Sequence, residues 1–533
     1  MSDMTINSAE IEARWRPSYN PWLVAVVVAL AAFMEVLDTS IANVALPYMA
    51  GNLGASNDQS TWVLTSYLVS NAIVLPMTGW LAGAVGRKRF FMSCLGVFTV
   101  SSLLCGVAPS LGFLLLFRIL QGAGGGGLQP MAQAILADTF PPEKRGLAFA
   151  LYGITAIMAP TIGPTLGGWI TFNYSWRWIF FINLPVGVIT WFLIRRFVED
   201  PPYLARLKSA GVKLDYVGIA LLAVGVGALQ ILLDKGQEDD WFGSHFIVTL
   251  IVISAVCLIA LVIWEWFQKA PVIDVRMFKN FNFASSSLMM FMLGVMIFSS
   301  LVLMPQFLQT LLGYTAELAG LALSAGGFVL LFEMPILGQL TTKIQARRLI
   351  AIGWLAVSIA MFYSTKRLDL LMSFSAATWL RIEQVIGFGF LFVSITLVAY
   401  IGIPAEKNNA VAGIVNFMRN IGSSVGTSLV TTLIARRSQF HQLRLVENAR
   451  TDNANFMTTA LGLGQHFVNS GLGSHEAQAT AYASIYRSLQ AQAASLAYID
   501  TFKVLSIGAS IMFFLSFILK KNDPGGGRAR MPE

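Results

Sequence analysis

Long apolar runs alternate with short polar stretches along almost the whole chain. A helix needs roughly 20 apolar residues to cross a bilayer core of about 30 Å. Runs on this scale lie at 22–46, 60–84, 90–107, 111–136, 146–170, 177–194, 216–233, 245–267, 283–303, 317–340, 349–363, 376–400, 410–434 and 499–519. The pattern predicts an all-α, polytopic membrane protein with 14 transmembrane helices.

Composition and charge support this interpretation. Of the 533 side chains, 56% are hydrophobic and 12% are charged, whereas soluble domains carry roughly 25% charged residues. The net charge of +8 does not indicate a nucleic-acid partner, because the basic residues form short clusters between the apolar runs. With the N-terminus inside, 23 Lys and Arg residues fall on the cytoplasmic side, and only Arg177, Lys235, Lys366 and Arg367 fall in the short outside loops. The positive-inside rule therefore predicts two cytoplasmic termini.

Cysteine and histidine offer no metal or redox site. The three cysteines lie inside apolar runs, and the four histidines lie outside these runs or at their edges. No zinc-ligand spacing or HExxH motif is present. We expect no cofactor and no metal, and we disfavour a membrane-embedded transferase because the histidines form no cluster.

One connection between the apolar runs is long. Residues 436–498 are too polar to span the membrane and fall on the outer side. Within this connection, residues 475–494 are rich in Ala, Gln and Ser without Pro or Gly, which predicts a helix. The segment is either a tolerated surface insertion or a docking element for an extracytoplasmic partner.

The sequence contains an internal repeat. Pro76, Gly79 and Leu81 recur as Pro335, Gly338 and Leu340. Arg118 and Gln121 recur as Arg381 and Gln384, and Ile162, Gly163 and Gly167 recur as Ile421, Gly422 and Gly426. The shifts of 259, 263 and 259 residues cover eight runs, so both copies have the same orientation in the membrane.

Parallel repeats related by an axis along the membrane normal resemble the architecture of the major facilitator superfamily. This resemblance implies two six-helix bundles with two inserted helices between them (6+2+6). The predicted segments are a cytoplasmic N-terminal segment 1–20, a bundle 21–197, a cytoplasmic linker 198–215, inserted helices 216–268, a second bundle 282–519 that includes the loop 436–498, and a cytoplasmic tail 520–533.

Two motifs resemble elements that govern conformational change in this superfamily. Gly79, Gly83, Gly86 and Arg87 resemble its loop between spans two and three, although Gly83 stands where the family usually has Asp. The charge-relay gate attributed to that Asp therefore cannot be carried over, and a loop that only sets topology remains an alternative. In span five, Pro160, Gly163, Pro164 and Gly167 resemble the signature of antiporters. Its alternative is a kinked packing helix.

Three longer matches resemble the 14-span drug/proton antiporters of the superfamily. They are the segment from Leu37 to Pro47 in span one, the segment from Trp176 to Pro185 at span six, and the segment from Asn416 to Gly422 in span thirteen. The resemblance implies a multidrug efflux pump of a bacterial inner membrane, of the kind that works in a tripartite system. It also implies lipophilic small-molecule substrates, a periplasmic adaptor and an outer-membrane channel.

Charges inside the predicted spans indicate where the proton is handled. A carboxylate at the bilayer midplane costs roughly 2.5–3.5 kcal/mol and is functional by default. Glu35 and Asp38 are three residues apart, so they share one helix face, and two such neighbours can bind and release a proton. We predict Asp38 as the principal proton carrier, Glu35 as its modulator and Arg118 as the switch; Asp38 as a helix cap is the alternative.

Other polar residues within the spans are candidates for the substrate cavity. They are Asn43, Gln121, Glu333, Arg381, Glu383, Asn416 and Arg419. Nearby Trp379 gives Arg381 an alternative role, that of a side chain extending to the membrane interface. Arg419 either contacts substrate or pairs with Glu333 or Glu383. A proton-coupled uptake symporter of the same fold remains the alternative function.

Overall fold

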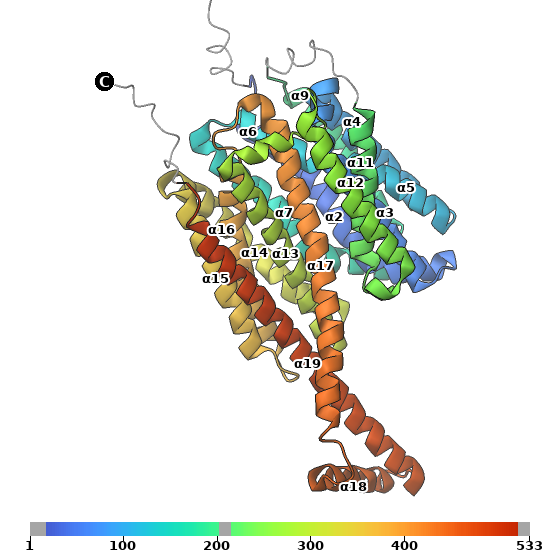
Figure 1. Ribbon diagram of the computed structural model, residues 1–533. Helices are drawn as coiled ribbons and strands as arrows, with labels where there is room; N and C mark the ends of the chain where they lie inside the picture. The colour runs from blue at the N-terminus through green and yellow to red at the C-terminus, as the bar shows by residue number, and fades with distance from the viewer. Residues whose placement is uncertain (1–16, 202–214, 521–533) are drawn as a thin grey trace, which may run out of the picture.

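The structure is a computed structural model that describes residues 17–201 and 215–520 (Figure 1). The remainder of the predicted N-terminal segment, linker and C-terminal tail (1–16, 202–214 and 521–533) lies outside the described residues. Within those two ranges, all regular secondary structure is helical. The all-α prediction is therefore confirmed.

The N-terminal half comprises six passes, and the insertion adds a pair of helices. The N-terminal helices are α2 (Pro21–Leu53), α3 (Asn57–Val85), α4 (Arg87–Gly106), α5 (Leu111–Gly125) with α6 (Leu128–Thr139), α7 (Arg145–Asn173), and α8 (Trp178–Phe181) with α9 (Asn183–Phe197). The inserted helices are α11 (Tyr216–Lys235) and α12 (His245–Phe267).

The C-terminal half supplies the other six passes. Its helices are α13 (Phe281–Thr310), α14 (Ala316–Lys343), α15 (Ala346–Arg367), α16 (Phe374–Ala399), α17 (Asn408–Val446) and α19 (Ser474–Ser516), with α18 (Ala454–Asn469) outside the bundle. Thirteen passes in the described ranges are long and apolar enough to cross a membrane. The fourteenth, α17, is more polar, yet it packs against α3, α13 and α19 inside the bundle. The number of passes agrees with the prediction.

The two halves meet along two seams. Helix α7 packs along α14, and α17 packs against α3 and α6. We call the end of the bundle at which α4 and α15 begin the basic end, because Arg87 and Arg348 lie in their first turns. The end from which α18 projects is the opposite end (Figure 1). A Cβ on Gly79 would lie 2.7 Å from the Cα of Ala410, so α3 and α17 touch closely at the basic end.

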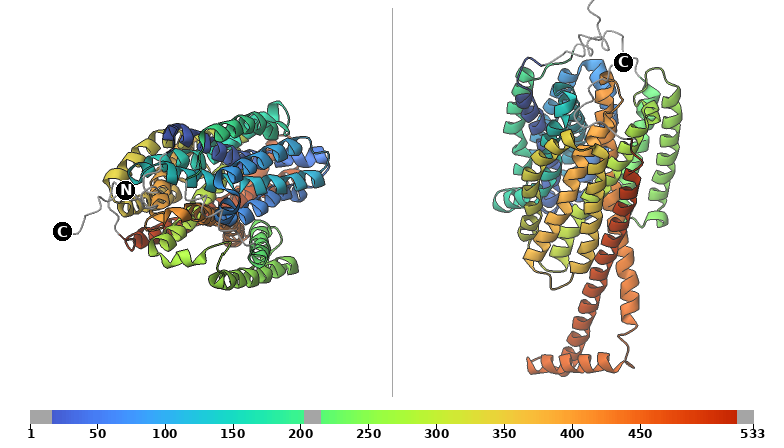
Figure 2. Two further views of the ribbon diagram at one scale, coloured as in Figure 1. Left: turned by 90° about the horizontal axis from the view of Figure 1, so that it is seen from above. Right: turned by 90° about the vertical axis from the view of Figure 1, so that its left-hand side faces the viewer.

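The inserted helix α11 bridges both halves. Lys235 at its end donates to the hydroxyl of Thr61 on α3, and Gln230 bonds Ser424 on α17 at 2.7 Å. Helix α12 packs on α11, and most of its surface is exposed. The pair stands beside the bundle in the right-hand view of Figure 2.

The segment 436–498 is helical over most of its length. Helix α17 continues past 436 to Val446, α18 crosses the tip, and α19 begins at Ser474, so the predicted helix at 475–494 is confirmed. Asp500 on α19 accepts hydrogen bonds from Arg437 Nε and His441 Nε2, both at 2.8 Å, which ties the two long helices together. The resulting hairpin projects well beyond the other helices (Figures 1 and 2).

Candidate functional site

Asp38 lies in the middle of α2 and is 2% exposed. Its Oδ2 accepts a hydrogen bond from Arg118 Nη1 at 2.7 Å, and its Oδ1 accepts from Gln121 Nε2 at 3.0 Å and Asn183 Nδ2 at 2.6 Å. Asn183 is itself held by Ser102 on α4. The buried carboxylate therefore has a full set of donors from α5 and α9.

Arg118 is fully buried beside Asp38. Its Nε donates to the carbonyl oxygen of Val63 at 3.2 Å, and its Nη1 also donates to Gln121 Oε1 at 2.8 Å. The guanidinium carbon lies 4.3 Å from the ring centroid of Tyr67, within cation–π range. These contacts from α3 and α5 fix the guanidinium against α2.

Glu35, one helical turn earlier on α2, has a separate set of partners. Its Oε1 accepts hydrogen bonds from Tyr67 Oη at 2.9 Å and Asn71 Nδ2 at 3.1 Å, and its Oε2 accepts one from Gln129 Nε2. Tyr67 thus contacts both groups, with its hydroxyl on Glu35 and its ring against Arg118. The two carboxylates belong to adjacent networks that share this tyrosine.

The Glu35 network continues into the C-terminal half. Arg419 on α17 donates to Gln129 Oε1, and Asn416 donates to Gln133 Oε1. Tyr152 on α7 donates to Asn416 Oδ1 at 3.2 Å. A chain of polar contacts therefore runs from Glu35 across the junction of the halves to α17.

Glycine on the fourth pass makes this arrangement possible. A Cβ on Gly125 would lie 2.5 Å from the Tyr67 hydroxyl and 3.3 Å from Glu35 Cγ. A Cβ on Gly122 would lie 2.4 Å from the carbonyl oxygen of Tyr67. Side chains larger than hydrogen would push this pass away from α2 and α3 and open the network.

The predicted antiporter signature places α7 against the helix that carries the carboxylates. A Cβ on Gly167 would lie 3.0 Å from the Ile41 carbonyl oxygen. Ser40 donates to the carbonyl oxygen of Pro160 at 3.0 Å, and Pro160 and Pro164 both lie within the continuous helix. The helix with the prolines and glycines is therefore the direct neighbour of the Asp38 turn.

A second buried charge pair lies at the basic end. The Arg87 side chain is fully buried and forms an ion pair with Asp138 at the end of α6. Asp138 also accepts a hydrogen bond from Asn408 at the start of α17. Because α6 and α17 belong to different halves, this cluster connects the halves at that end.

The glycines of the same predicted motif have different roles. Gly86 has a φ of +99° and separates α3 from α4. A Cβ on Gly83 would meet nothing within 4 Å, so this position has room for the side chain that the family usually carries there.

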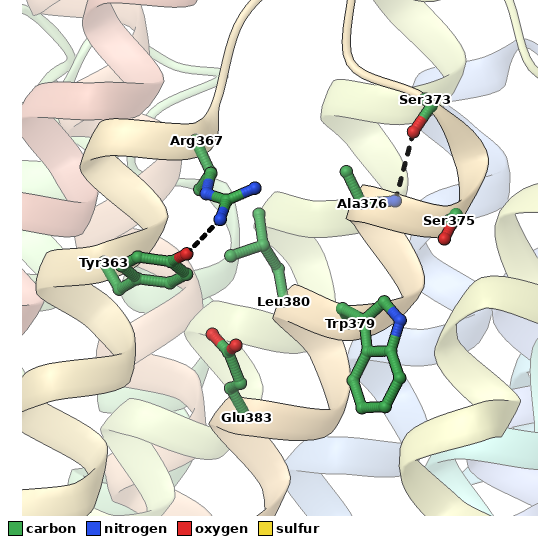
Figure 3. A pocket seen from close by; sticks show the side chains of 8 residues that line it. All are labelled: Tyr363, Arg367, Ser373, Ser375, Ala376, Trp379, Leu380 and Glu383. Atoms are coloured by element: carbon green, nitrogen blue, oxygen red, sulfur yellow. Dashed lines mark hydrogen bonds between the residues drawn. The ribbon is translucent and has the colours of Figure 1, made fainter.

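The remaining predicted cavity residues are dispersed. Asn43 is exposed, and Arg419 bonds Gln129 rather than Glu333 or Glu383. Arg381 is 0% exposed, so the alternative in which it extends to the membrane interface is wrong. Glu383 faces a pocket between α15 and α16 at the opposite end, shared with Arg367 and Trp379 (Figure 3).

Neutral residues supply much of the network that the sequence did not indicate. Tyr67, Asn71, Gln129 and Asn183 all contact a buried carboxylate. Only Asn183 lay in a motif that the sequence singled out. The described residues contain no group of three His, Cys, Asp or Glu side chains that could hold a metal ion.

The fold of two linked helix bundles with charges buried between the helices is that of a multi-pass membrane transporter. The family model of the Major Facilitator Superfamily matches residues 28–427, and the chain belongs to this superfamily. It is 37% identical over 460 residues to the multidrug export protein EmrB of Escherichia coli (strain K12), a match that covers 86% of this chain and 88% of that protein.

Two further comparisons agree. The chain is 40% identical to the fatty acid resistance protein FarB of Neisseria gonorrhoeae, with 84% of this chain and 87% of that protein covered. Among solved structures it is similar to the proton:xylose symporter XylE, with a TM-score of 0.60, 13% identity, and coverage of 94% and 96%. At that identity the second match shows the fold alone.

Proposed function

We propose that this protein is a proton-driven multidrug efflux transporter that exports lipophilic compounds across a bacterial inner membrane. Similarity to a multidrug export protein over 86% of the chain supports the class of transporter. The observation that carries the coupling is the buried pair of Asp38 and Arg118, 2.7 Å apart. In this proposal both termini are cytoplasmic, and the basic end is the cytoplasmic end.

The pair is suited to a switch because its charge balance depends on one proton. Removing one partner of a buried ion pair costs about 3–5 kcal/mol, because it leaves an isolated charge. A proton on Asp38 removes the negative charge and weakens the attachment of Arg118, so α5 can separate from α2. Loss of the proton restores the attachment and returns the protein to its first state.

The driving force is adequate for export by alternating access. The membrane potential contributes about 2.3 kcal/mol per charge per 100 mV, and each pH unit contributes about 1.4 kcal/mol. One or two protons moving inward therefore provide several kcal/mol for the outward movement of a substrate. The seams between α7 and α14 and between α3 and α17 are where the halves rock against each other.

The test uses Asp38→Asn, which keeps the size of the side chain and one acceptor oxygen but removes the charge. In proteoliposomes with an imposed pH gradient, we expect this variant to bind drug and lose gradient-driven export. Asp239→Asn, at an exposed carboxylate between α11 and α12, is the matched control and retains export. Undiminished export by Asp38→Asn contradicts the proposal.

The symporter alternative predicts the opposite direction of flux. A proton-driven symporter shares this fold, as the similarity to XylE illustrates. In everted vesicles energised to be acidic inside, an antiporter accumulates substrate, whereas a symporter does not. Accumulation is expected here, because the proline- and glycine-containing α7 resembles the antiporter signature.

We also propose that the helical hairpin beyond the membrane docks a periplasmic adaptor, which connects the pump to an outer-membrane channel. Helix α18 and the ends of α17 and α19 present exposed apolar side chains, including Leu443, Leu461 and Tyr486. Replacing 454–469 by a flexible linker of equal length should abolish co-purification with the adaptor and leave flux in proteoliposomes intact. Unchanged co-purification contradicts this assignment.

A further inference from the structure

Arg381 on α16 carries a buried positive charge that no described residue balances. The side chain is 0% exposed, and Nη1 donates to Ser300 Oγ on α13 at 2.9 Å. Its Nε and Nη2 are also buried, and neither has a hydrogen-bond partner among the described residues. No carboxylate in the described ranges lies within 4.0 Å of it.

The internal repeat shows which partner Arg381 lacks. Arg381 and Gln384 correspond to Arg118 and Gln121 of the N-terminal half. There, Gln121 Oε1 accepts from the arginine while its amide donates to Asp38. Gln384 instead donates to Ser364 Oγ on α15 at 3.1 Å, and its Oε1 is buried without a partner. The second half repeats the arginine and the amide without the carboxylate.

The acid is absent from the whole neighbouring helix. Shifted by the repeat lengths of 259 and 263 residues, Asp38 falls on Ile297 or Leu301. Helix α13, Phe281–Thr310, contains no Asp or Glu at any position. The second half therefore lacks a carboxylate at this place by sequence and not merely by side-chain orientation.

An unbalanced arginine differs physically from an unbalanced carboxylate. Both oxygens of Glu333 on α14 are also buried without partners, close to Gly389. A carboxyl group can bind a proton and become neutral, but arginine stays charged in proteins. A buried, permanently charged group requires an anion to offset its lost hydration. Of these two sites, only the arginine needs a charged ligand.

We propose that Arg381 is the head-group anchor for an organic anion, so that the pump accepts lipophilic substrates with a carboxylate or a similarly acidic group. This inference rests on the proposed export function and names a substrate class for it. The unpartnered Nε and Nη2 offer two donors to one planar anion, the arrangement that guanidinium provides for carboxylates.

The site opens only when helices of the C-terminal half move. Gly326 on α14 packs against the aliphatic part of the Arg381 side chain, because a Cβ there would lie 3.2 Å from Arg381 Cγ. The next residue, Gly327, faces Thr161 of α7 across the junction of the halves, with its added Cβ 3.3 Å from Thr161 Cγ2. Rocking at this seam displaces α14, which packs on the Arg381 side chain.

The experiment measures binding without any gradient, so its outcome is independent of proton coupling. The full chain is reconstituted in nanodiscs of phosphatidylcholine. Radiolabelled naphthoate, naphthylmethanol and naphthylmethylammonium are compared as ligands, because they share a ring system and differ in head group. We expect naphthoate to bind roughly tenfold more tightly than the alcohol, the discrimination expected from charge-assisted hydrogen bonds.

Substitutions test whether Arg381 is responsible for the preference for naphthoate. Arg381→Gln should lose the tenfold advantage of naphthoate and leave binding of the ammonium compound unchanged, whereas Arg381→Lys should retain some of it. Arg348→Gln, at an exposed arginine at the start of α15, is the matched control and keeps the wild-type preference. If Arg381→Gln does not fold, the head-group preference of wild type and of Arg381→Lys decides.

Three results overturn the proposal. One is equal affinity of the wild type for naphthoate and the alcohol, and another is full retention of the preference by Arg381→Gln. The third is competition by phosphatidylglycerol added to the nanodiscs, which would identify an anionic lipid as the occupant in place of a transported substrate. A loss of gradient-driven export with intact naphthoate preference would instead count only against the proton-coupling proposal.

Discussion

Tyr67 links the two carboxylates of α2 through different atoms of one side chain. Its hydroxyl donates to Glu35 at 2.9 Å, and its ring faces Arg118 at 4.3 Å. Tyr67→Phe removes only the first contact, which should cost about 1.5–3 kcal/mol because the acceptor is charged and buried. Tyr67→Leu also removes the cation–π contact and should cost about 1–2 kcal/mol more. Thermal unfolding in detergent should rank the variants in this order.

Tyr482→Phe provides the control for this series. Tyr482 is 39% exposed and stacks on Phe456, so its substitution should change stability by less than about 0.5 kcal/mol. Equal unfolding temperatures for Tyr67→Phe and Tyr67→Leu would show that the ring contact with Arg118 contributes nothing.

The site residues predicted from the sequence are charged, whereas most of those that were not predicted are neutral. Asp38, Glu35 and Arg118 stand out because a charge within an apolar run is costly and therefore rare. Tyr67, Asn71 and Gln129 are neutral, and such side chains also occur in spans as ordinary packing residues. Their role depends on which helices are in contact. The periodicity of apolar residues does not predict that α2, α3 and α6 pack together.

At the scale of helices, the close approach of α7 to α2 provides a sharp test. A Cβ on Gly167 would lie 2.9 Å from Ile41 Cγ2 and 3.1 Å from Ile41 Cα, whereas a Cβ on neighbouring Gly168 would lie 3.8 Å from Val44. Gly167→Ala should destabilise the protein by about 1–3 kcal/mol, because helix backbone must move. Gly168→Ala should be neutral or stabilising, since alanine favours helix.

The transport rate of these two variants separates packing from gating. If α7 must slide on α2 during transport, Gly167→Ala slows export in proteoliposomes more than its loss of folded protein explains. Equal export rates per folded molecule for both variants would limit Gly167 to a packing role.

Helix α17 is more polar than the other thirteen passes in the described ranges. It carries Asn416, Arg419 and Asn420 in its membrane portion and falls outside the set of apolar passes. Its polar residues meet polar partners from the other half, such as Gln129 and Gln133, so the helix tolerates them. The apolar run 410–434 located this span from sequence, and the repeat supported it because its glycines match those of span five, but its extension to Val446 was not predicted.

At the scale of the molecule, the halves are in contact at the basic end through α3, α6 and α17. Buried Asn408, which is 2% exposed, donates to Asp138, and Asp138 is paired with Arg87. The glycine contact between Gly79 and Ala410 lies beside this cluster. Closure here therefore depends on the polar cluster of Asn408, Asp138 and Arg87 and on close helix packing.

Asn408→Ala should weaken this polar cluster without altering the contact between Gly79 and Ala410. Loss of a hydrogen bond to a charged group is worth about 1.5 kcal/mol or more, which changes the ratio of closed to open molecules by roughly tenfold. Spin labels at Arg89→Cys and Arg348→Cys, both exposed at the basic end, report the separation of the halves after the native cysteines are replaced by serine. We expect the distance distribution to gain a longer component in Asn408→Ala.

Asn173→Ala removes an exposed amide at the opposite end and should leave the distribution unchanged. An unaltered distribution in Asn408→Ala would mean that the packing of Gly79 on Ala410 is sufficient for closure, and that the bond to Asp138 only follows it.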